Sequence, residues 1–251
     1  MRIFNRRTPV LAESIILLYH RVANVKDDPH KLSVSPENFK AQLKAMERIL
    51  PPVSLQQIVV GIKSGHPVRG FAVSFDDGYS DNFTNALPIL VRLKVPATIF
   101  VVSGKVDATS PYEWDEQTAK LDRGRAMSKI ELSQVDSSPL IEIGAHTVNH
   151  PHLGKSSPKI QKTEIENSKQ ELEKILGHKI SGLAYPFGAS GDDFTDQTKT
   201  ITKEAGFDYA CINIRGKIGP DFDGFFGLPR VLIRDWSPKQ MLEEIKDVLP
   251  Q

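Results

Sequence analysis

The chain has little of three features that would narrow its class at once. Among its 251 residues there is one cysteine, Cys211, so neither an intrachain disulfide nor a metal site built on cysteine pairs is available. Lys and Arg number 32 against 31 Asp and Glu, and the net charge of +1 gives no electrostatic footprint for nucleic acid. We therefore expect no nucleic-acid partner. Glycine and proline number 17 each without any repeat, which excludes collagen-like and solenoid classes.

Long apolar runs are also absent. No segment approaches the roughly 20 apolar residues that a membrane-spanning helix needs, so we expect no transmembrane segment. Arg2, Arg6 and Arg7 could open a signal peptide, but Glu13 and Ser14 interrupt the apolar run that should follow. The remaining run is shorter than the roughly 7–15 residues of a secretory hydrophobic region. The expectation is a cytoplasmic protein.

What the chain does contain is a regular alternation of two kinds of segment. Short apolar segments that predict buried strands alternate with segments of helical spacing, and this order predicts a parallel α/β architecture. Several helix starts are marked by a serine before proline, or by a serine three residues before Gln or Glu. The expected strands are 15–19, 71–75, 97–102, 140–144, 182–185, 209–212 and 230–233, and the marked helix starts are Ser35, Ser54, Ser128, Ser157 and Ser237.

Two polar motifs follow expected strands. Asp76-Asp77-Gly78 comes after the second strand, and by itself it is more typical of a turn with a capping aspartate. His146 and His150 follow the fourth strand at a spacing that lets two imidazoles converge on one ion. Asp77, His146 and His150 would together give three protein ligands and an open position, which is typical of a catalytic metal. Asp76 would then be free to act as general base.

The two motifs resemble those of a known family. Phe75-Asp76-Asp77-Gly78 and His146-Thr147-x-x-His150 are similar, in this order, to the first two motifs of NodB-type polysaccharide deacetylases, carbohydrate esterase family 4. The resemblance runs from about Tyr19 to Ile233. It implies a distorted (β/α)7 barrel, a single domain over residues 1–251, and hydrolysis of N-acetyl groups on sugars. It also implies that Asp76 is the base and that Asp77, His146 and His150 bind the metal.

The third family motif is only partly present. Ala184-Tyr185-Pro186-Phe187-Gly188 keeps the Pro-Phe-Gly part, and the family implies that the Phe187 backbone N–H helps to stabilise the oxyanion. A simple bend after a strand would account for the same residues. Ala184 stands where the family has an arginine that orients the catalytic aspartate. Arg230, on the last expected strand, is the candidate replacement, with a structural salt bridge as the alternative.

The sequence departs further from the family pattern at the general acid, the residue that protonates the leaving group. Many family members supply it from a histidine motif near the C-terminus, but no histidine follows His178. Leu18-Tyr19-His20-Arg21-Val22 resembles a segment of the exopolysaccharide branch, which includes biofilm poly-N-acetylglucosamine deacetylases. In that branch this histidine lies in the active site, so the resemblance makes His20 the acid. The alternative is a partly buried histidine that hydrogen-bonds to backbone.

Other aromatic and histidine side chains are assigned smaller roles. Tyr79, Tyr185 and Trp114 are candidates for contacts with the sugar, although a tryptophan such as Trp114 is more often a core or rim aromatic than a sugar platform. His152 follows the metal ligands so closely that we expect it to support them or to pack, rather than to bind the ion. His30, His66 and His178 are expected in solvent.

These assignments predict a metal-dependent hydrolase that removes N-acetyl groups from an N-acetylated sugar or polysaccharide and releases acetate. One divalent ion is implied, zinc first, although cobalt, nickel and iron accept the same ligands. The expected partner is the N-acetylated glycan. Two alternatives stay open: an amidase for a small non-sugar amide, and a glycan-binding pseudoenzyme.

Overall fold

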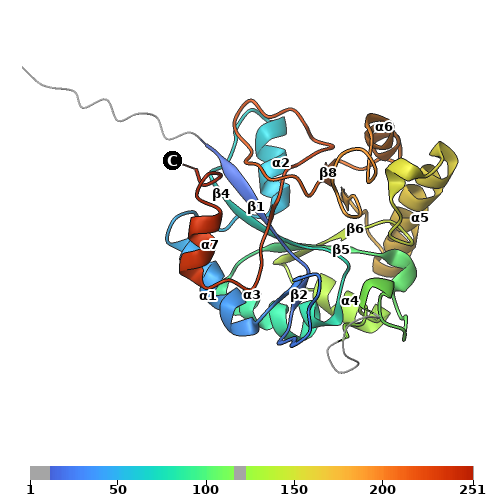
Figure 1. Cartoon of the computed structure of the whole chain (residues 1–251). Coiled ribbons are helices and arrows are strands. Elements are labelled where there is room, and N and C mark those ends of the chain that lie inside the picture. The colour runs from blue at the N-terminus through green and yellow to red at the C-terminus, as the bar shows by residue number, and fades with distance from the viewer. Residues whose placement is uncertain (1–11, 116–122, 251) are drawn as a thin grey trace, which may run out of the picture.

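A curled sheet of seven parallel strands forms the centre of the molecule. The computed structural model describes residues 12–115 and 123–250, so Arg2, Arg6 and Arg7 lie outside it. The strand order is β8-β7-β6-β5-β4-β1-β9, and all seven expected strands are confirmed to within two residues at each end (Figure 1). They are β1 (Ser14–Tyr19), β4 (Gly70–Phe75), β5 (Ala97–Val101), β6 (Ile141–Ala145), β7 (Gly182–Ala184), β8 (Tyr209–Cys211) and β9 (Val231–Leu232).

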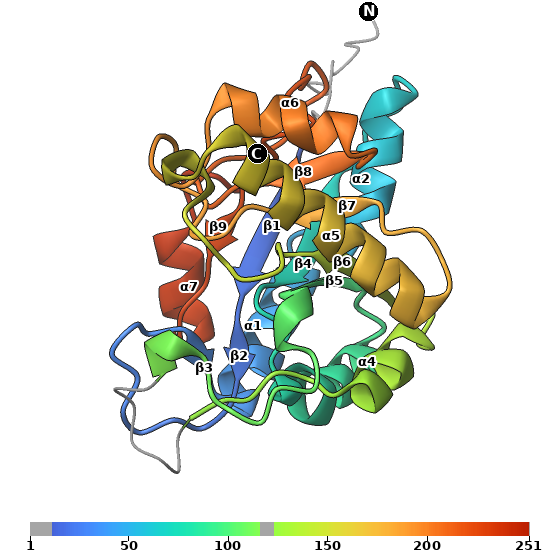
Figure 2. The same ribbon diagram turned by 90° about the vertical axis from the view of Figure 1, so that its right-hand side faces the viewer.

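The segment that leads into β9 brings the two edges of this sheet together. Leu228 donates its N–H to the Ala210 carbonyl of β8, and Arg230 donates its N–H to the Ile214 carbonyl just beyond β8. The same segment then continues as β9, which pairs with β1 through Leu17 and Val231 (Figure 2). The expected fold, a distorted (β/α)7 barrel, is confirmed.

Seven α-helices accompany the barrel in the described part of the chain. The five marked helix starts are confirmed, and in each case the serine side chain accepts a hydrogen bond from the first helical turn. Two helices, α3 and α6, had no marked start: α3 begins without a side-chain cap, and α6 uses Thr195 with Thr198 instead of Gln or Glu. The helices are α1 (Pro36–Glu47), α2 (Leu55–Lys63), α3 (Leu87–Leu93), α4 (Lys129–Asp136), α5 (Pro158–Leu176), α6 (Asp196–Glu204) and α7 (Pro238–Glu244).

Smaller elements were not predicted from the sequence. Two-residue strands β2 (Arg21–Val22) and β3 (Ser33–Val34) pair with each other beyond the end of β1. A π-helix at Asn82–Ala86 precedes α3, and short 3₁₀ turns occupy Ser103–Lys105, Glu113–Asp115 and Leu153–Lys155. All of these lie in or next to connections that follow the carboxyl ends of the strands, and they shape the surroundings of the site described below.

The strand side chains divide between two cores because successive residues point to opposite faces of a sheet. Ile15, Leu17 and Tyr19 pack with the helices outside the sheet, whereas Ile16 packs with Phe100 and Tyr209 and with helix α2. Every residue of β1 and β4 is buried, as expected for a parallel sheet that is covered on both faces.

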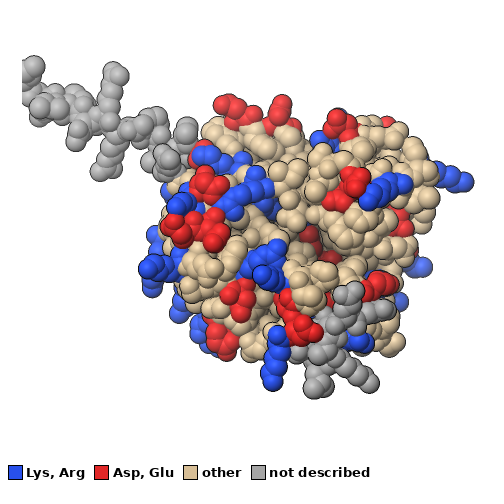
Figure 3. Space-filling model, in the orientation of Figure 1, with Lys and Arg blue, Asp and Glu red and all other residues tan. Residues whose placement is uncertain are grey.

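The face shown in Figure 3 mixes Lys and Arg with Asp and Glu, and red acidic atoms are visible at the bottom of a central hollow. Within residues 12–115 and 123–250, no helix combines the length and apolar character needed to cross a bilayer.

Phe39 of α1 provides a test of the outer core. Its ring is fully buried and meets the rings of Tyr19 and Phe75 at centroid distances of 5.0 and 5.7 Å. Phe39→Ala should lower the free energy of unfolding by about 3–5 kcal/mol, because it removes buried apolar area and leaves a cavity. Chemical denaturation measures this. Ile130→Ala, at a 73 % exposed position, is the control and should cost less than about 0.5 kcal/mol. Equal losses would contradict the packing described.

Candidate active site

A cavity of about 280 Å³ opens at the carboxyl ends of the strands. Four strand ends deliver a residue directly to it: His20 follows β1, Asp76 follows β4, His146 follows β6 and Leu232 ends β9. The remaining lining residues are His30, Leu32, Asp77, Trp114, His150, Phe187 and Asn213. The structure thus brings together both carboxylates and both histidines of the first two motifs, along with His20 and Phe187.

Asp76 is held by Arg230 in a two-point contact. The guanidinium Nη1 and Nη2 atoms donate to the two carboxylate oxygens at 2.6 and 2.7 Å, and Arg230 also donates through Nε to the Ile212 carbonyl. Both side chains are almost completely buried. Burial alone raises the pKa of Asp76, but the charge of Arg230, with help from His146 and the Arg230 hydrogen bonds, outweighs burial and brings the pKa to about 2. Asp76 is therefore an ionised carboxylate with a fixed orientation.

Asp77, His146 and His150 converge beside this pair. Asp77 Oδ1 lies 3.6 Å from His146 Nε2 and 3.5 Å from His150 Nε2. These separations exceed those of ordinary hydrogen bonds. They suit atoms around a shared ion, since ligands at 2.0–2.1 Å from a tetrahedral centre lie about 3.3 Å apart. His146 Nδ1–H donates to the Ala184 carbonyl at 2.7 Å, so its Nε2 lone pair faces Asp77.

The charges of the three donors also fit a cation. Burial lowers the pKa of His146 and lowers that of His150 further, so both rings are neutral ligands at neutral pH. Burial, and then the neighbouring charge of Asp76, raises the pKa of Asp77 well above its usual range. A buried carboxylate in this position is stabilised when it coordinates a cation. The donor set therefore fits a divalent metal ion.

The backbone at this site is held in an unusual conformation. Seven described residues other than glycine have positive φ, and four of them are Asp77 (70°), Thr147 (64°), His150 (58°) and Phe187 (61°). Such conformations cost of order 1–3 kcal/mol each and persist only where the surroundings enforce them. Glu164 of α5 helps to enforce the conformation of the loop at 146–150, which carries both histidines. Its carboxylate accepts hydrogen bonds from the backbone N–H groups of Val148 and Asn149, at 3.0 and 2.8 Å.

His20 lies in the cavity wall with its Nδ1 buried and without a hydrogen-bond partner among the described residues. His20 is therefore not a histidine that is held by a hydrogen bond to the backbone, which was the alternative to a catalytic role. Burial lowers the pKa of His20 to about 4, with Asp76 opposing this shift and Arg230 and His146 adding to it. The free imidazole is neutral at neutral pH, so it must gain a proton in the course of a reaction before it can donate one.

Trp114 forms the cavity wall next to His150, and two buried tyrosines on its other side hold it in place. Its ring lies 4.6 Å from that of His150 and stacks on Tyr112, and its Nε1–H donates to the Tyr79 hydroxyl. Tyr79 in turn donates to Asp115 at 2.8 Å and is completely buried. This corrects the expectation that Tyr79 touches the sugar: it supports Trp114 from inside the fold.

Tyr185 requires a similar correction. Its ring is completely buried, stacks on Phe194 and donates its hydroxyl to the Phe226 carbonyl, so its side chain does not reach the cavity. Phe187, two residues later, does line the cavity and is 45 % exposed. No acceptor for its backbone N–H is found within residues 12–115 and 123–250. His152 stacks on the Phe187 ring outside the cavity lining.

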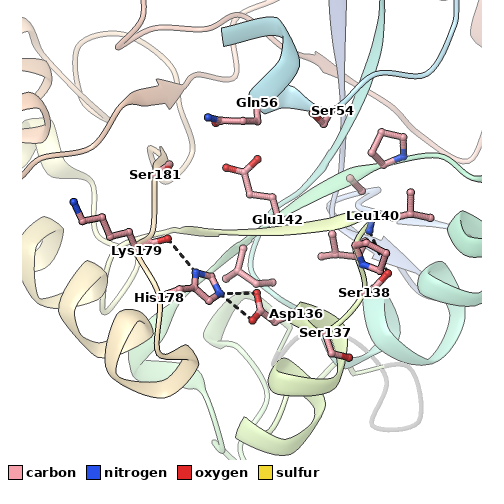
Figure 4. Close-up of a pocket in the computed structure, with 15 residues that line it drawn as sticks. Ser54, Gln56, Asp136, Ser137, Ser138, Leu140, Glu142, His178, Lys179 and Ser181 are labelled. Atoms are coloured by element: carbon pink, nitrogen blue, oxygen red, sulfur yellow. Dashed lines mark hydrogen bonds and ion pairs between the residues drawn. The ribbon is translucent and has the colours of Figure 1, made fainter. Parts of the chain in front are cut away.

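A second and larger hollow, of about 510 Å³, lies at the amino ends of the strands. Three of its ionisable side chains already have partners: His178 contacts Asp136 (Figure 4), and Glu142 accepts hydrogen bonds from Tyr209 and Thr98. His178 and His66 are exposed, as expected. His30 is exposed too, although it borders the cavity that contains Asp77, His146 and His150.

The barrel and the Asp/His₂ donor set at its strand ends define a class of protein, and comparison with known proteins identifies the family. The sequence model of the polysaccharide deacetylases matches residues 63–210, so the chain belongs to this family. The chain is 28 % identical over 213 residues to poly-beta-1,6-N-acetyl-D-glucosamine N-deacetylase of Staphylococcus aureus strain MRSA252, a match that covers 81 % of this chain and 68 % of that protein.

Solved structures agree with the fold. The polysaccharide deacetylase BC0361 from Bacillus cereus superposes with a TM-score of 0.76 at 25 % identity, covering 94 % of this chain and 69 % of that one. IcaB from Ammonifex degensii gives a TM-score of 0.76 at 22 % identity, covering 94 % and 96 %. The family resemblance drawn from the two motifs is confirmed.

The Asp76–Arg230 pair gives a prediction about stability. Arg230→Met should lower the free energy of unfolding by about 3–5 kcal/mol, because it leaves the Asp76 charge buried without its partner. The double variant Asp76→Asn with Arg230→Met should recover most of this loss, since no unpaired charge remains. Urea denaturation of the four proteins measures the coupling. Losses that simply add would show that the two side chains do not stabilise each other.

Proposed function

We propose that this protein is a metal-dependent N-deacetylase of N-acetylglucosamine polymers. The observation that carries the proposal is the adjacency, in one cavity, of an Arg230-bound Asp76 carboxylate and the Asp77, His146 and His150 donor set. The family and the activity named for the Staphylococcus aureus relative support it.

Asp77, His146 and His150 are the residues proposed to hold the ion, with zinc as the first candidate. A divalent ion at this place supplies a Lewis acid for the acetyl carbonyl and lowers the pKa of water. The protein contributes two neutral imidazoles and one carboxylate, and the Ala184 carbonyl keeps His146 in the tautomer that can bind.

Three residues are then assigned to the hydrolysis itself. Asp76 accepts the proton of the attacking water, and Arg230 keeps its carboxylate ionised and aimed at the cavity. The Phe187 backbone N–H donates to the carbonyl oxygen as negative charge develops there. A donor whose conformation is fixed beforehand stabilises that charge without having to reorganise.

His20 is proposed as the acid for the leaving group. Its imidazole borders the same cavity as Asp76, and because the free ring is neutral it receives the proton that Asp76 has taken from the attacking water. Donation to the sugar nitrogen completes cleavage of the C–N bond and releases acetate and a free amine. The pseudoenzyme alternative rested partly on the missing family arginine, and the Arg230–Asp76 contact supports the catalytic proposal over it.

The metal site has a direct test that needs no substrate. Protein stripped with a chelator and titrated with zinc by calorimetry should show one site, and Asp77→Asn should weaken it by more than about 100-fold, because a charged ligand is lost. His66→Ala, at an exposed histidine, is the control and should bind as the wild type does. The metal proposal fails if folded protein binds neither zinc nor cobalt, nickel or iron, or if Asp77→Asn binds as tightly as wild type.

Activity tests the base. Wild-type protein should release acetate from β-1,6-linked N-acetylglucosamine oligomers, and Asp76→Asn should lower kcat by about 10²–10⁴-fold, because the proton acceptor is lost. Acetate release is followed by a coupled assay, with β-1,4-linked oligomers alongside to compare linkages. Equal turnover by Asp76→Asn and wild type, with metal affinity unchanged, would remove Asp76 from the mechanism.

A further inference from the structure

The turn that carries Phe187 lies against the segment that follows the metal-binding histidines. The ring of Phe187 meets His150 edge to face at 4.7 Å, and it stacks on His152 at 3.9 Å with only 7° between the planes. Phe187 itself has φ of 61°, a left-handed conformation that a phenylalanine keeps only where its neighbours enforce it. The parallel His152 ring is one of those neighbours.

His152 is in turn held by an aspartate from beyond the Phe187 turn. Asp193 Oδ1 accepts a hydrogen bond from His152 Nδ1–H at 2.6 Å, and its other carboxylate oxygen accepts the Ala189 backbone N–H at 2.8 Å. The Asp193 backbone carbonyl also accepts the Gly154 N–H at 3.2 Å. One buried residue therefore ties the turn at 187–189 to the segment at 152–154.

The two segments leave no space for adjustment between them. A Cβ placed on Gly154 would lie 2.1 Å from the Gly191 carbonyl oxygen and 2.6 Å from that of Asp192. On the far side of the turn, the Asn213 N–H donates to the Gly188 carbonyl at 2.9 Å. The Phe187 turn is thus clamped between the end of β8 and the segment that contains His152.

We propose that His152 and Asp193 are positioning residues that hold the Phe187 backbone N–H in place for the reaction. This inference rests on the proposed function, in which that N–H donates to the developing oxyanion. His152 does not line the cavity, so it acts through Phe187 and not on the substrate. A donor that is displaced by a fraction of an ångström loses most of its effect on the transition state, while substrate affinity changes little.

The test uses variants that remove the ring, the hydrogen bond or both. His152→Ala should lower kcat for acetate release by roughly 10- to 100-fold with KM within about twofold. His152→Asn keeps an N–H for Asp193, and His152→Phe keeps the stacked ring, so each should recover part of the loss. Asp193→Ala should resemble His152→Ala, and the double variant should be no worse than either, because both residues serve one contact.

His178→Ala is the matched control. His178 also pairs with an aspartate, Asp136, at 2.9 Å, but it lies at the opposite end of the barrel (Figure 4). Its loss should leave kcat unchanged. Hydrogen exchange, measured without substrate, should show faster exchange of the amides at 187–190 in His152→Ala and Asp193→Ala but not in His178→Ala.

The outcomes separate this inference from the proposed function. If wild-type protein releases no acetate, the proposed function fails. The exchange rates alone then decide whether His152 and Asp193 hold the turn at 187–189 in place. If His152→Ala raises KM and leaves kcat unchanged, His152 binds substrate and the positioning role is overturned. The same conclusion follows if His152→Ala matches His178→Ala in both kcat and exchange. Zinc affinity is measured in parallel, and a loss in His152→Ala as large as that of Asp77→Asn would place its effect on the metal ligands instead.

Discussion

The two-point contact between Asp76 and Arg230 determines the charge of the whole cavity. Asp76 and Asp77 are adjacent in sequence and both are buried, so without compensation they would repel each other in a medium of low dielectric. Arg230 compensates one of the two charges and leaves the other. With His146 and His150 neutral, Asp77 is the carboxylate left without a compensating charge, and its raised pKa shows that its ionised form needs a cation beside it. The proposed base and the proposed metal site therefore both depend on this ion pair.

The chemistry is concentrated on backbone that is strained and tightly supported. Asp77, His150 and Phe187 all adopt left-handed conformations, which aim their side chains or N–H groups where regular strand ends would not. The supports are polar residues outside the cavity: Glu164 under the histidine loop and Asp193 beside the Phe187 turn. The hydrogen bonds to these supports offset the cost of the strained backbone and so keep the groups of the site in fixed positions.

The sequence allowed the seven strands and the Asp77, His146 and His150 cluster to be predicted, because each depends on local pattern and on strand ends meeting at one edge. Arg230 could be named as a candidate, but its contact with Asp76 spans 154 residues and has no local signal. Tyr79 and Tyr185 were misplaced because exposure of an aromatic depends on what packs over it, here Trp114 and Phe194. Glu164 and Asp193 could not be predicted because their partners, backbone N–H groups and the side chains of Asn149 and His152, come close to them only in the folded chain.

The segment that closes the barrel also has a consequence for how the enzyme matures. A ribosome makes Asp77, His146 and His150 long before it makes residues 228–232, which join β8 to β1 and bring in the guanidinium. A nascent or truncated chain that stops short of them holds all three side chains of the donor set, but its Asp76 has no guanidinium partner and its barrel is not closed between β8 and β1. Order of synthesis thus separates the three side chains of the donor set from the guanidinium that orients Asp76, which arrives with the segment that closes the barrel.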